Sequence, residues 1–157
     1  MSTLILRSTC LGLLVCIGAA GCQTSHAWTD TSSNLTPATP TRIDRLLPGQ
    51  GLRMNQSIAS DNRQFKLIMQ GDGNLVLYKP DLRAAWASNT YHANSGSPSL
   101  FMQADGNLVM YDQTGKPMWA SNTWGNPGAI LVVKDDGNAV IQDSSGHVLW
   151  ATNNSAG

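Results

Sequence analysis

Three stretches of similar sequence constrain this chain more than any other feature. They read MQGDGNLVLY (residues 69–78), MQADGNLVMY (residues 102–111) and VKDDGNAVIQ (residues 133–142). A tryptophan follows each stretch, in AAWASNT, PMWASNT and VLWATNN, and both landmarks recur after 33 and then 31 residues. Repeats of this length indicate one supersecondary unit each, which buries its apolar face only against its neighbours. The three units are therefore expected to close on one another.

Each unit has the pattern of short strands joined by turns. Apolar-rich runs such as FKLIMQ and SLFMQ precede the DGN centre, and NLVLY or its counterpart follows it. A turn containing Gly or Pro then leads to the tryptophan. Such spacing predicts an all-β sandwich, barrel or repeat fold. Trp86, Trp119 and Trp150 are predicted to form a shared core, because large apolar rings stabilise packing; a role in ligand binding is the alternative.

The DGN centre has a purely structural explanation, but its flanking residues point further. Asp-Gly between apolar runs favours a two-residue hairpin, because glycine accepts a positive φ. Alternate residues of a strand share a face, and the two sides of a hairpin come opposite each other. The first unit is therefore expected to collect five residues on one patch: Gln70, Asp72, Asn74, Val76 and Tyr78.

The second unit repeats the same set of residues, at Gln103, Asp105, Asn107, Val109 and Tyr111. Each patch combines amide donors, amide and carboxylate acceptors, and a phenol. It contains no metal-like cluster and no nucleophile with a base. The combination suits a neutral ligand rich in hydroxyl groups, each of which can donate and accept.

The third unit serves as an internal control. It keeps Asp136, Asn138 and Val140, but Lys134 replaces the glutamine and Gln142 replaces the tyrosine. A hairpin needs its turn, whereas it does not need these two side chains. Their loss indicates a binding site that has become degenerate in this unit.

The repeated Q-x-D-x-N-x-V-x-Y pattern, with a tryptophan strand after each copy, resembles the bulb-type mannose-binding lectins of monocots, from about Leu46 to Asn154. The resemblance implies a β-prism II fold with three four-stranded sheets and pseudo-threefold symmetry. It implies metal-independent binding of mannose or α-mannosides, without a cofactor, at two intact sites and one degenerate site. In the family, Asp and Asn hold the 2-hydroxyl, Gln the 3-hydroxyl and Tyr the 4-hydroxyl, while Val packs on the sugar ring.

The resemblance also bears on partners. The expected partner is a mannose-containing glycan or a related polysaccharide. Family dimers exchange strands through the C-terminal tail; because few residues follow Trp150, a monomer and a homodimer both stay open. A lectin-like bacteriocin, or an interaction scaffold that binds no sugar, is the alternative function on the same fold.

The N-terminus predicts export and a lipid anchor. Arg7 precedes an apolar run that is too short to span a bilayer but suits a secretory signal. The run ends in AAGC, which resembles a bacterial lipobox, so residues 1–21 are predicted to be a lipoprotein signal peptide and Cys22 the lipidated residue. Cleavage after Ala27 by an ordinary signal peptidase is the alternative.

The rest of the chain divides into a tether and a domain. Residues 22–41 are rich in Ser, Thr, Pro and Asn and are predicted to be disordered. Residues 42–157 form the predicted lectin domain. The protein is expected on the cell envelope, in the outer membrane if the cell has one because Gln23 follows Cys22. The domain would then face the periplasm or the surface.

Charge and motif content argue against other classes of protein. Ten Lys and Arg residues balance ten acids, all aspartate, and no basic cluster stands out, so nucleic acid is not an expected partner. No triad spacing or glycosidase acid pair is evident, so an enzyme is not expected. Asp72 and Asn74 resemble the start of a calcium loop, but Arg83 stands where an EF-hand requires Glu.

Overall fold

The computed structural model describes residues 42–91 and 96–153. The predicted signal peptide, the tether with Cys22 and the residues after 153 lie outside this part. Within it, no helix is long and apolar enough to cross a membrane. Its regular elements are twelve strands: β1 (Arg45–Leu46), β2 (Gly51–Arg53), β3 (Ser57–Ala59), β4 (Lys66–Met69), β5 (Leu75–Tyr78), β6 (Ala84–Ala87), β7 (Ser99–Met102), β8 (Leu108–Tyr111), β9 (Pro117–Ala120), β10 (Ile130–Val133), β11 (Ala139–Gln142) and β12 (Val148–Ala151).

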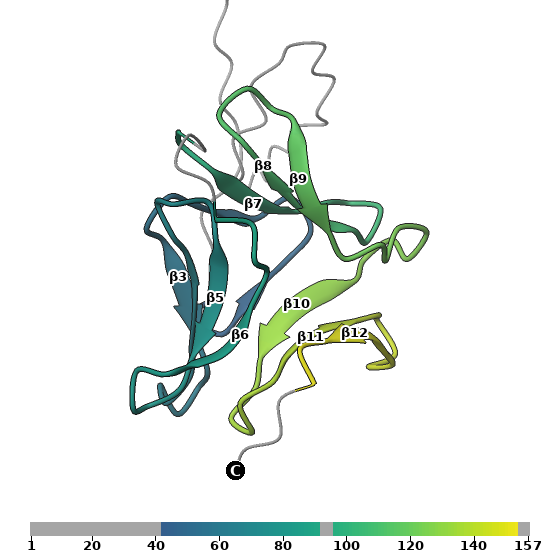
Figure 1. Ribbon diagram of the computed structural model, residues 1–157. Coiled ribbons are helices and arrows are strands. Elements are labelled where there is room, and N and C mark those ends of the chain that lie inside the picture. The colour runs from purple at the N-terminus through teal and green to yellow at the C-terminus, as the bar shows by residue number, and fades with distance from the viewer. Residues whose placement is uncertain (1–41, 92–95, 154–157) are drawn as a thin grey trace, which may run out of the picture. The chain divides into compact units, whose positions relative to one another are not determined.

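The strands form three antiparallel sheets of four, in the orders β3-β4-β5-β6, β2-β7-β8-β9 and β1-β10-β11-β12 (Figure 1). Each repeat supplies three consecutive strands of one sheet. The fourth strand always comes from residues 45–59, which precede the first repeat: β3 pairs with β4, β2 with β7 and β1 with β10. The expected all-β fold with three four-stranded sheets is confirmed.

Strand alternation gives each hairpin an inner and an outer face. In the first hairpin Leu67 pairs with Leu77, and both are buried. The buried side chains of the three sheets form one apolar cluster. Each short N-terminal strand contributes one residue to it: Leu46, Leu52 or Ile58. The outer face of each hairpin is left to carry the motif residues, because period-two alternation sends them the other way.

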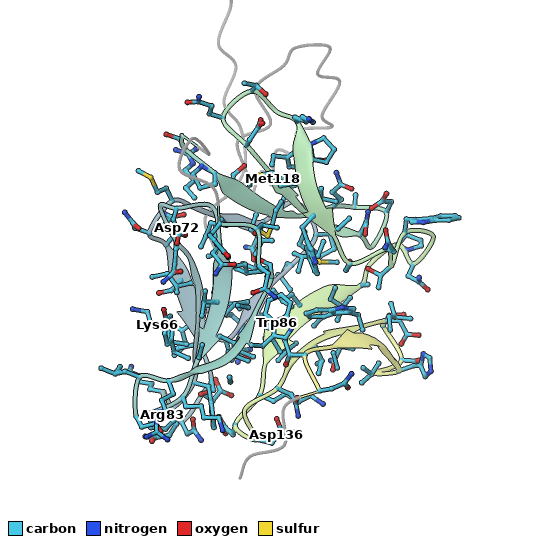
Figure 2. The ribbon with its side chains drawn as sticks, in the orientation of Figure 1. Lys66, Asp72, Arg83, Trp86, Met118 and Asp136 are labelled. Carbon is cyan, nitrogen blue, oxygen red and sulfur yellow. The ribbon has the colours of Figure 1, made fainter. Side chains whose placement is uncertain are left out.

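Trp86, Trp119 and Trp150 pack against this cluster and against one another. Their ring centroids lie 5.5, 5.6 and 6.0 Å apart, with interplanar angles between 69° and 81°. Figure 2 shows Trp86 between the sheets. Edge-to-face rings at this spacing attract one another beyond their area of burial. The predicted core role of the tryptophans is confirmed, although the rings are half-buried rather than fully enclosed.

Loops from other parts of the chain cover two of the DGN turns. The Asn126 amide nitrogen donates to the Asp105 carbonyl at 3.0 Å, so the loop before β10 covers the β7–β8 turn. A Cβ on Gly106 would lie 2.2 Å from the carbonyl oxygen of Asn126. A Cβ on Gly137 would lie 2.7 Å from the ring of Phe65, in the loop before β4. Glycine at these two positions therefore permits neighbouring sheets to meet at their turns.

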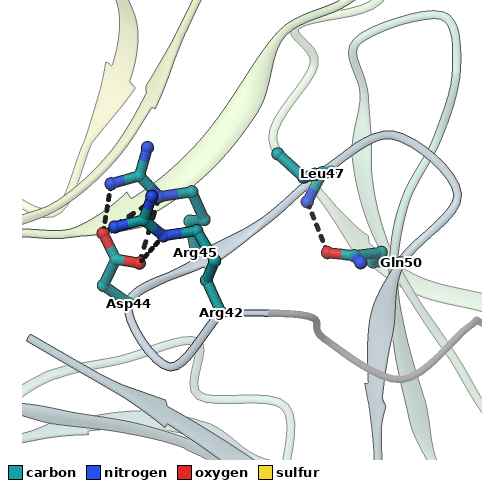
Figure 3. Close-up of polar contacts among 5 residues, drawn as sticks. All are labelled: Arg42, Asp44, Arg45, Leu47 and Gln50. Atoms are coloured by element: carbon teal, nitrogen blue, oxygen red, sulfur yellow. Dashed lines mark hydrogen bonds and ion pairs between the residues drawn. The ribbon is translucent and has the colours of Figure 1, made fainter.

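A buried carboxylate holds the N-terminal segment (Figure 3). The Asp44 side chain is 3% exposed and accepts hydrogen bonds from Arg45 Nε at 2.9 Å and Arg42 Nε at 3.3 Å. Its carbonyl oxygen accepts from the Val133 amide at 2.8 Å, which ties the segment to the end of β10. The hydrogen bonds from Arg45 hold the pKa of Asp44 below its ordinary value, against the opposing effect of burial.

We expect Asp44→Asn to lower the free energy of unfolding by about 2 kcal/mol near neutral pH, because buried hydrogen bonds to charged groups are lost. The folded-state pKa of Asp44 is lowered. Its stabilisation is therefore present above the unfolded-state pKa of about 3.9 and is lost as the pH falls through the folded-state value. Urea unfolding of the unmodified protein and of the Asp44→Asn variant should be measured from neutral to acidic pH. The difference between their free energies of unfolding should shrink as the pH falls.

Asp81→Asn is the matched control for this experiment. Asp81 is 53% exposed and forms an ion pair with Arg83 at 3.6 Å, and Arg83 is itself 83% exposed. Exposed pairs contribute little to stability, so this variant should stay within about 0.5 kcal/mol of the unmodified protein. Equal losses in the two variants would contradict the role given to Asp44.

Candidate functional site

The first motif occupies the hairpin between β4 and β5. The Gln70 amide donates to the Asn74 carbonyl at 2.9 Å, and the Gly73 amide donates to the Gln70 carbonyl at 3.1 Å. The connecting loop therefore has three residues, whereas the sequence predicted two. Gly73 adopts a φ of 87°. A β-turn followed by a left-handed glycine is the usual three-residue hairpin loop, and Asp-Gly is compatible with both loop lengths.

Hydrogen bonds orient the two polar side chains of this loop. Asp72 Oδ1 accepts from the Asn74 amide at 2.9 Å. Asn74 Oδ1 accepts from Ser88 Oγ at 3.0 Å and from the Thr90 amide at 3.4 Å. Among the described residues, Asp72 Oδ2 and Asn74 Nδ2 have no hydrogen-bond partner. A carboxylate acceptor and an amide donor are therefore available next to each other.

Ser88 and Thr90 support the site, although the repeated motif did not predict a role for them. Thr90 is buried, and its hydroxyl donates to the Gly73 carbonyl at 2.8 Å. The two hydroxyl oxygens lie 2.6 Å apart. The available signal was the S-x-T that follows the tryptophan in the first two repeats, where the third repeat has T-x-N.

Gln70 and Tyr78 form a side-chain pair across the hairpin. Gln70 Nε2 donates to Tyr78 Oη at 2.8 Å. The amide oxygen and the phenolic hydrogen remain available to a ligand. Val76 lies on the same outer face, opposite Ile68, and is 3% exposed. Together with Asp72 at the turn end of the sheet (Figure 2), the five predicted residues of this motif belong to one hairpin.

The second motif repeats this geometry on β7 and β8. Gln103 Nε2 donates to Tyr111 Oη at 2.7 Å, and the Asn107 amide donates to Asp105 Oδ1 at 2.9 Å. The equivalent serine and threonine bind Asn107 Oδ1 at 3.1 and 3.2 Å. Val109 is 5% exposed. Burial raises the pKa of Tyr111, so its hydroxyl stays protonated at neutral pH and can donate.

The third motif keeps the turn without the side-chain pair. The Lys134 amide donates to the Asn138 carbonyl at 2.8 Å, and the Asn138 amide donates to Asp136 Oδ1 at 2.9 Å. No hydrogen bond between the side chains of Lys134 and Gln142 occurs in the part of the chain that is described. The same hairpin therefore forms without glutamine and tyrosine, so folding does not require that pair.

The chemistry of the two intact motifs is that of polar recognition. Each presents a carboxylate, two amides and a phenol on one outer face, around a valine floor. Residues 42–91 and 96–153 contain no group of three or more His, Cys, Asp or Glu side chains that could hold a metal ion. Such donors and acceptors match a ligand with several hydroxyl groups.

Several solved structures similar to this chain are mannose-binding lectins, and its three four-stranded sheets match their β-prism II fold. Monomeric monocot mannose-binding lectins from Gastrodia elata are 40% identical, over 71% of this chain and 98% of theirs, with a TM-score of 0.63. The mannose-specific agglutinin of snowdrop (Galanthus nivalis) bulbs, solved with methyl α-D-mannoside, is 41% identical over 73% and 99%, with a TM-score of 0.58. The Polygonatum cyrtonema lectin, solved with a monomannoside, is 38% identical over 71% and 96%, with a TM-score of 0.59. No protein-family model and no curated protein matches the chain.

Proposed function

The chain belongs to the family of monocot mannose-binding lectins, and from this premise we propose that it binds mannose-containing glycans without metal, at two sites. The first site consists of Gln70, Asp72, Asn74, Val76 and Tyr78, and the second of Gln103, Asp105, Asn107, Val109 and Tyr111. The third motif is the degenerate one. The protein acts as a binding module and not as an enzyme.

One observation carries this proposal. The hydrogen-bonded Gln–Tyr pair is present in the first two repeats at 2.8 and 2.7 Å, and the third repeat forms the same loop without it. A pair that folding does not require, kept beside an oriented Asp and Asn, is best explained by a ligand. Neighbouring structures solved with mannosides support a sugar as that ligand.

The free polar atoms of each site suit a hexose with two or three adjacent hydroxyls. Asp72 Oδ2 and the Gln70 amide oxygen accept hydrogen bonds, whereas Asn74 Nδ2 and the Tyr78 hydroxyl donate. An epimer with one hydroxyl inverted leaves one of these groups unpaired, at about 1–3 kcal/mol. The sites are therefore selective. Binding of a single sugar is weak, because a shallow site on one sugar has few atoms to offset lost freedom.

We further propose that the protein is exported, lipidated at Cys22 and displayed on the cell envelope. Two sites per chain, and many chains on one membrane, would raise avidity without any new contact. The lipobox-like AAGC and the polar tether of residues 22–41 support this arrangement. Weak single sites on an anchored protein are sufficient for capture of a polyvalent glycan.

Gln70→Ala/Gln103→Ala is expected to weaken mannoside binding strongly and to leave the fold intact. Each substitution removes an acceptor and the partner of the tyrosine hydroxyl, at about 1–3 kcal/mol per site, or roughly fivefold to 150-fold in affinity. Calorimetric titration of residues 23–157 with methyl α-mannoside measures the loss, with methyl α-galactoside as the epimer. Circular dichroism checks the fold, and a chelator should change nothing.

The matched control removes the corresponding side chains of the third repeat, as Lys134→Ala/Gln142→Ala. This variant should bind methyl α-mannoside as the unmodified protein does. An unchanged affinity of the Gln70→Ala/Gln103→Ala protein for methyl α-mannoside would refute the assigned sites. A folded protein that binds neither mannosides nor a wider glycan panel would be a scaffold and not a lectin.

A further inference from the structure

A pocket of about 470 Å³ adjoins the first motif and shares Tyr78 with it. The described residues that line it include no acidic side chain. Figure 2 shows Lys66 on this sheet between Asp72, at the β4–β5 turn, and Arg83, at the opposite end. Two groups of side chains line the pocket. One consists of the cations Arg63, Lys66 and Lys79, and the other of the apolar residues Ile68, Pro80 and Leu82.

Within the described residues, none of the three cationic side chains forms an ion pair or a hydrogen bond. The neighbouring acid, Asp81, is paired with Arg83 and does not line the pocket. The chain as a whole has a formal net charge of zero, so this concentration of positive charge is local. Three unpaired cations around one hollow favour an anion there.

Backbone strain is concentrated at the same place. Arg63 and Leu82 have φ values of 60° and 65°, and every other described residue with a positive φ is Asn or Gly. Left-handed conformations are unfavourable for bulky side chains, and such strain gathers at functional sites. The other repeats have Gly115 and Gly146 where the first has Leu82. Leu82 is 81% exposed, so its side chain is not retained for the core.

The cationic wall belongs to the first repeat alone. Lys66 pairs with Tyr78 across β4 and β5, whereas the second repeat places Ser99 opposite its tyrosine. At the position of Lys79 the second repeat has Asp112. The two proposed sugar sites therefore have the same motif, but two cationic positions of the first are neutral or acidic in the second.

We propose that this pocket is a subsite for an acidic sugar unit, bearing a carboxylate or a phosphate, that is joined to the neutral sugar at the first motif. The inference rests on the proposed function. The cations receive the acidic group, and the apolar side chains pack against the C–H face of the sugar ring. Because Tyr78 lines both places, the two sugars are adjacent units of one glycan. The second site takes neutral units only.

The test compares three disaccharides of equal size with a common mannose unit: one neutral, one with a uronate and one with a phosphate on the second unit. Calorimetry on residues 23–157 in about 20 mM salt should show one or both acidic probes binding about tenfold more tightly than the neutral one. The advantage should shrink as salt is added, because salt screens partly exposed charges. The two acidic probes distinguish the carboxylate from the phosphate.

Arg63→Asn/Lys66→Ser/Lys79→Gln should remove this advantage, so that the ratio of acidic to neutral affinity falls to about one. Asn tolerates the left-handed backbone at residue 63, and Ser is the second repeat's own residue. The matched control, Arg53→Gln/Lys116→Gln/Lys134→Gln, removes equal charge outside the pocket and should keep the ratio.

The outcomes separate the subsite from the lectin activity. Equal binding of acidic and neutral probes would overturn the subsite and leave the proposed function standing. Loss of the advantage in both triple variants would also overturn it, because a general charge effect would then explain the preference. Absence of binding by every probe would overturn both proposals. Binding of acidic probes alone, lost only in the pocket variant, would support the subsite and refute neutral mannoside binding.

Discussion

Gly106→Ala is expected to lower the free energy of unfolding by about 4 kcal/mol, a loss typical only of severe steric or backbone defects. Gly106 has a φ of 90°, where an L-residue loses about 1–2 kcal/mol. Its new Cβ would also lie 2.2 Å from the Asn126 carbonyl oxygen, which is backbone and cannot rotate away. The β7–β8 turn and the loop before β10 would have to separate. Urea unfolding followed by circular dichroism measures this loss.

Gly115→Ala separates the two causes. Gly115 has a φ of 81°, but a Cβ there would meet no atom of the described residues within 4 Å. This variant should therefore show the backbone effect alone, about 1–2 kcal/mol. The difference between the variants measures how strongly the turn is held against its covering loop. Similar losses for the two would mean that the loop yields readily, which would contradict a tight contact at Asn126.

Trp119→Ala should lower the free energy of unfolding by about 3 kcal/mol, near the lower end for tryptophan because the ring is half-buried. Two edge-to-face contacts are lost with it, at 6.0 Å to Trp86 and 5.6 Å to Trp150. Since each ring touches both others, Trp86→Ala should have a similar effect. Trp86→Ala/Trp119→Ala should lose less free energy of unfolding than the two single variants together, because both single variants already remove the contact between these two rings.

Trp124→Ala is the control for the tryptophan core. Trp124 is 69% exposed and should change the stability by less than about 0.5 kcal/mol. Denaturation curves read by circular dichroism avoid the change in tryptophan fluorescence that both substitutions bring. A Trp119→Ala protein as stable as the control would contradict the core role of the three tryptophans. Their role in ligand binding, the alternative open from the sequence, would then have to be tested.

The repeats and their local structure were determined by the sequence itself. Period-two alternation, as in KLIM and LVLY, predicts which side chains enter the core and which share the outer face. The Asp-Gly pairs predict the hairpins. Comparison of the three repeats indicates that the turn does not require Gln70 and Tyr78, because the third repeat keeps the turn without these residue types. These features depend on neighbouring residues and on backbone preferences, so one stretch of sequence is sufficient to specify each of them.

The length of the hairpin loop and the contacts that support the site could be predicted less well from the sequence. The sequence predicted a two-residue turn, and the structure has three residues closed by Gly73 in the left-handed region. Asp-Gly is compatible with a two-residue and with a three-residue loop. The register of the strand pair, with Met69 opposite Leu75, selects the three-residue loop. The support of Asn74 by Ser88 and Thr90 spans fourteen to sixteen residues and depends on the β5–β6 pairing.

The tertiary structure alone decided how the three units meet. Residues 45–59 distribute β1, β2 and β3 over three different sheets, and no local pattern states which repeat each strand joins. Arg63, Lys66 and Lys79 are a second example: they form no basic cluster along the chain, and only the fold brings them to one pocket. The chain specifies strands and turns through short-range sterics. Strands that are distant in sequence are paired by burial of one common core, and this also brings the three cations together, only in the folded state.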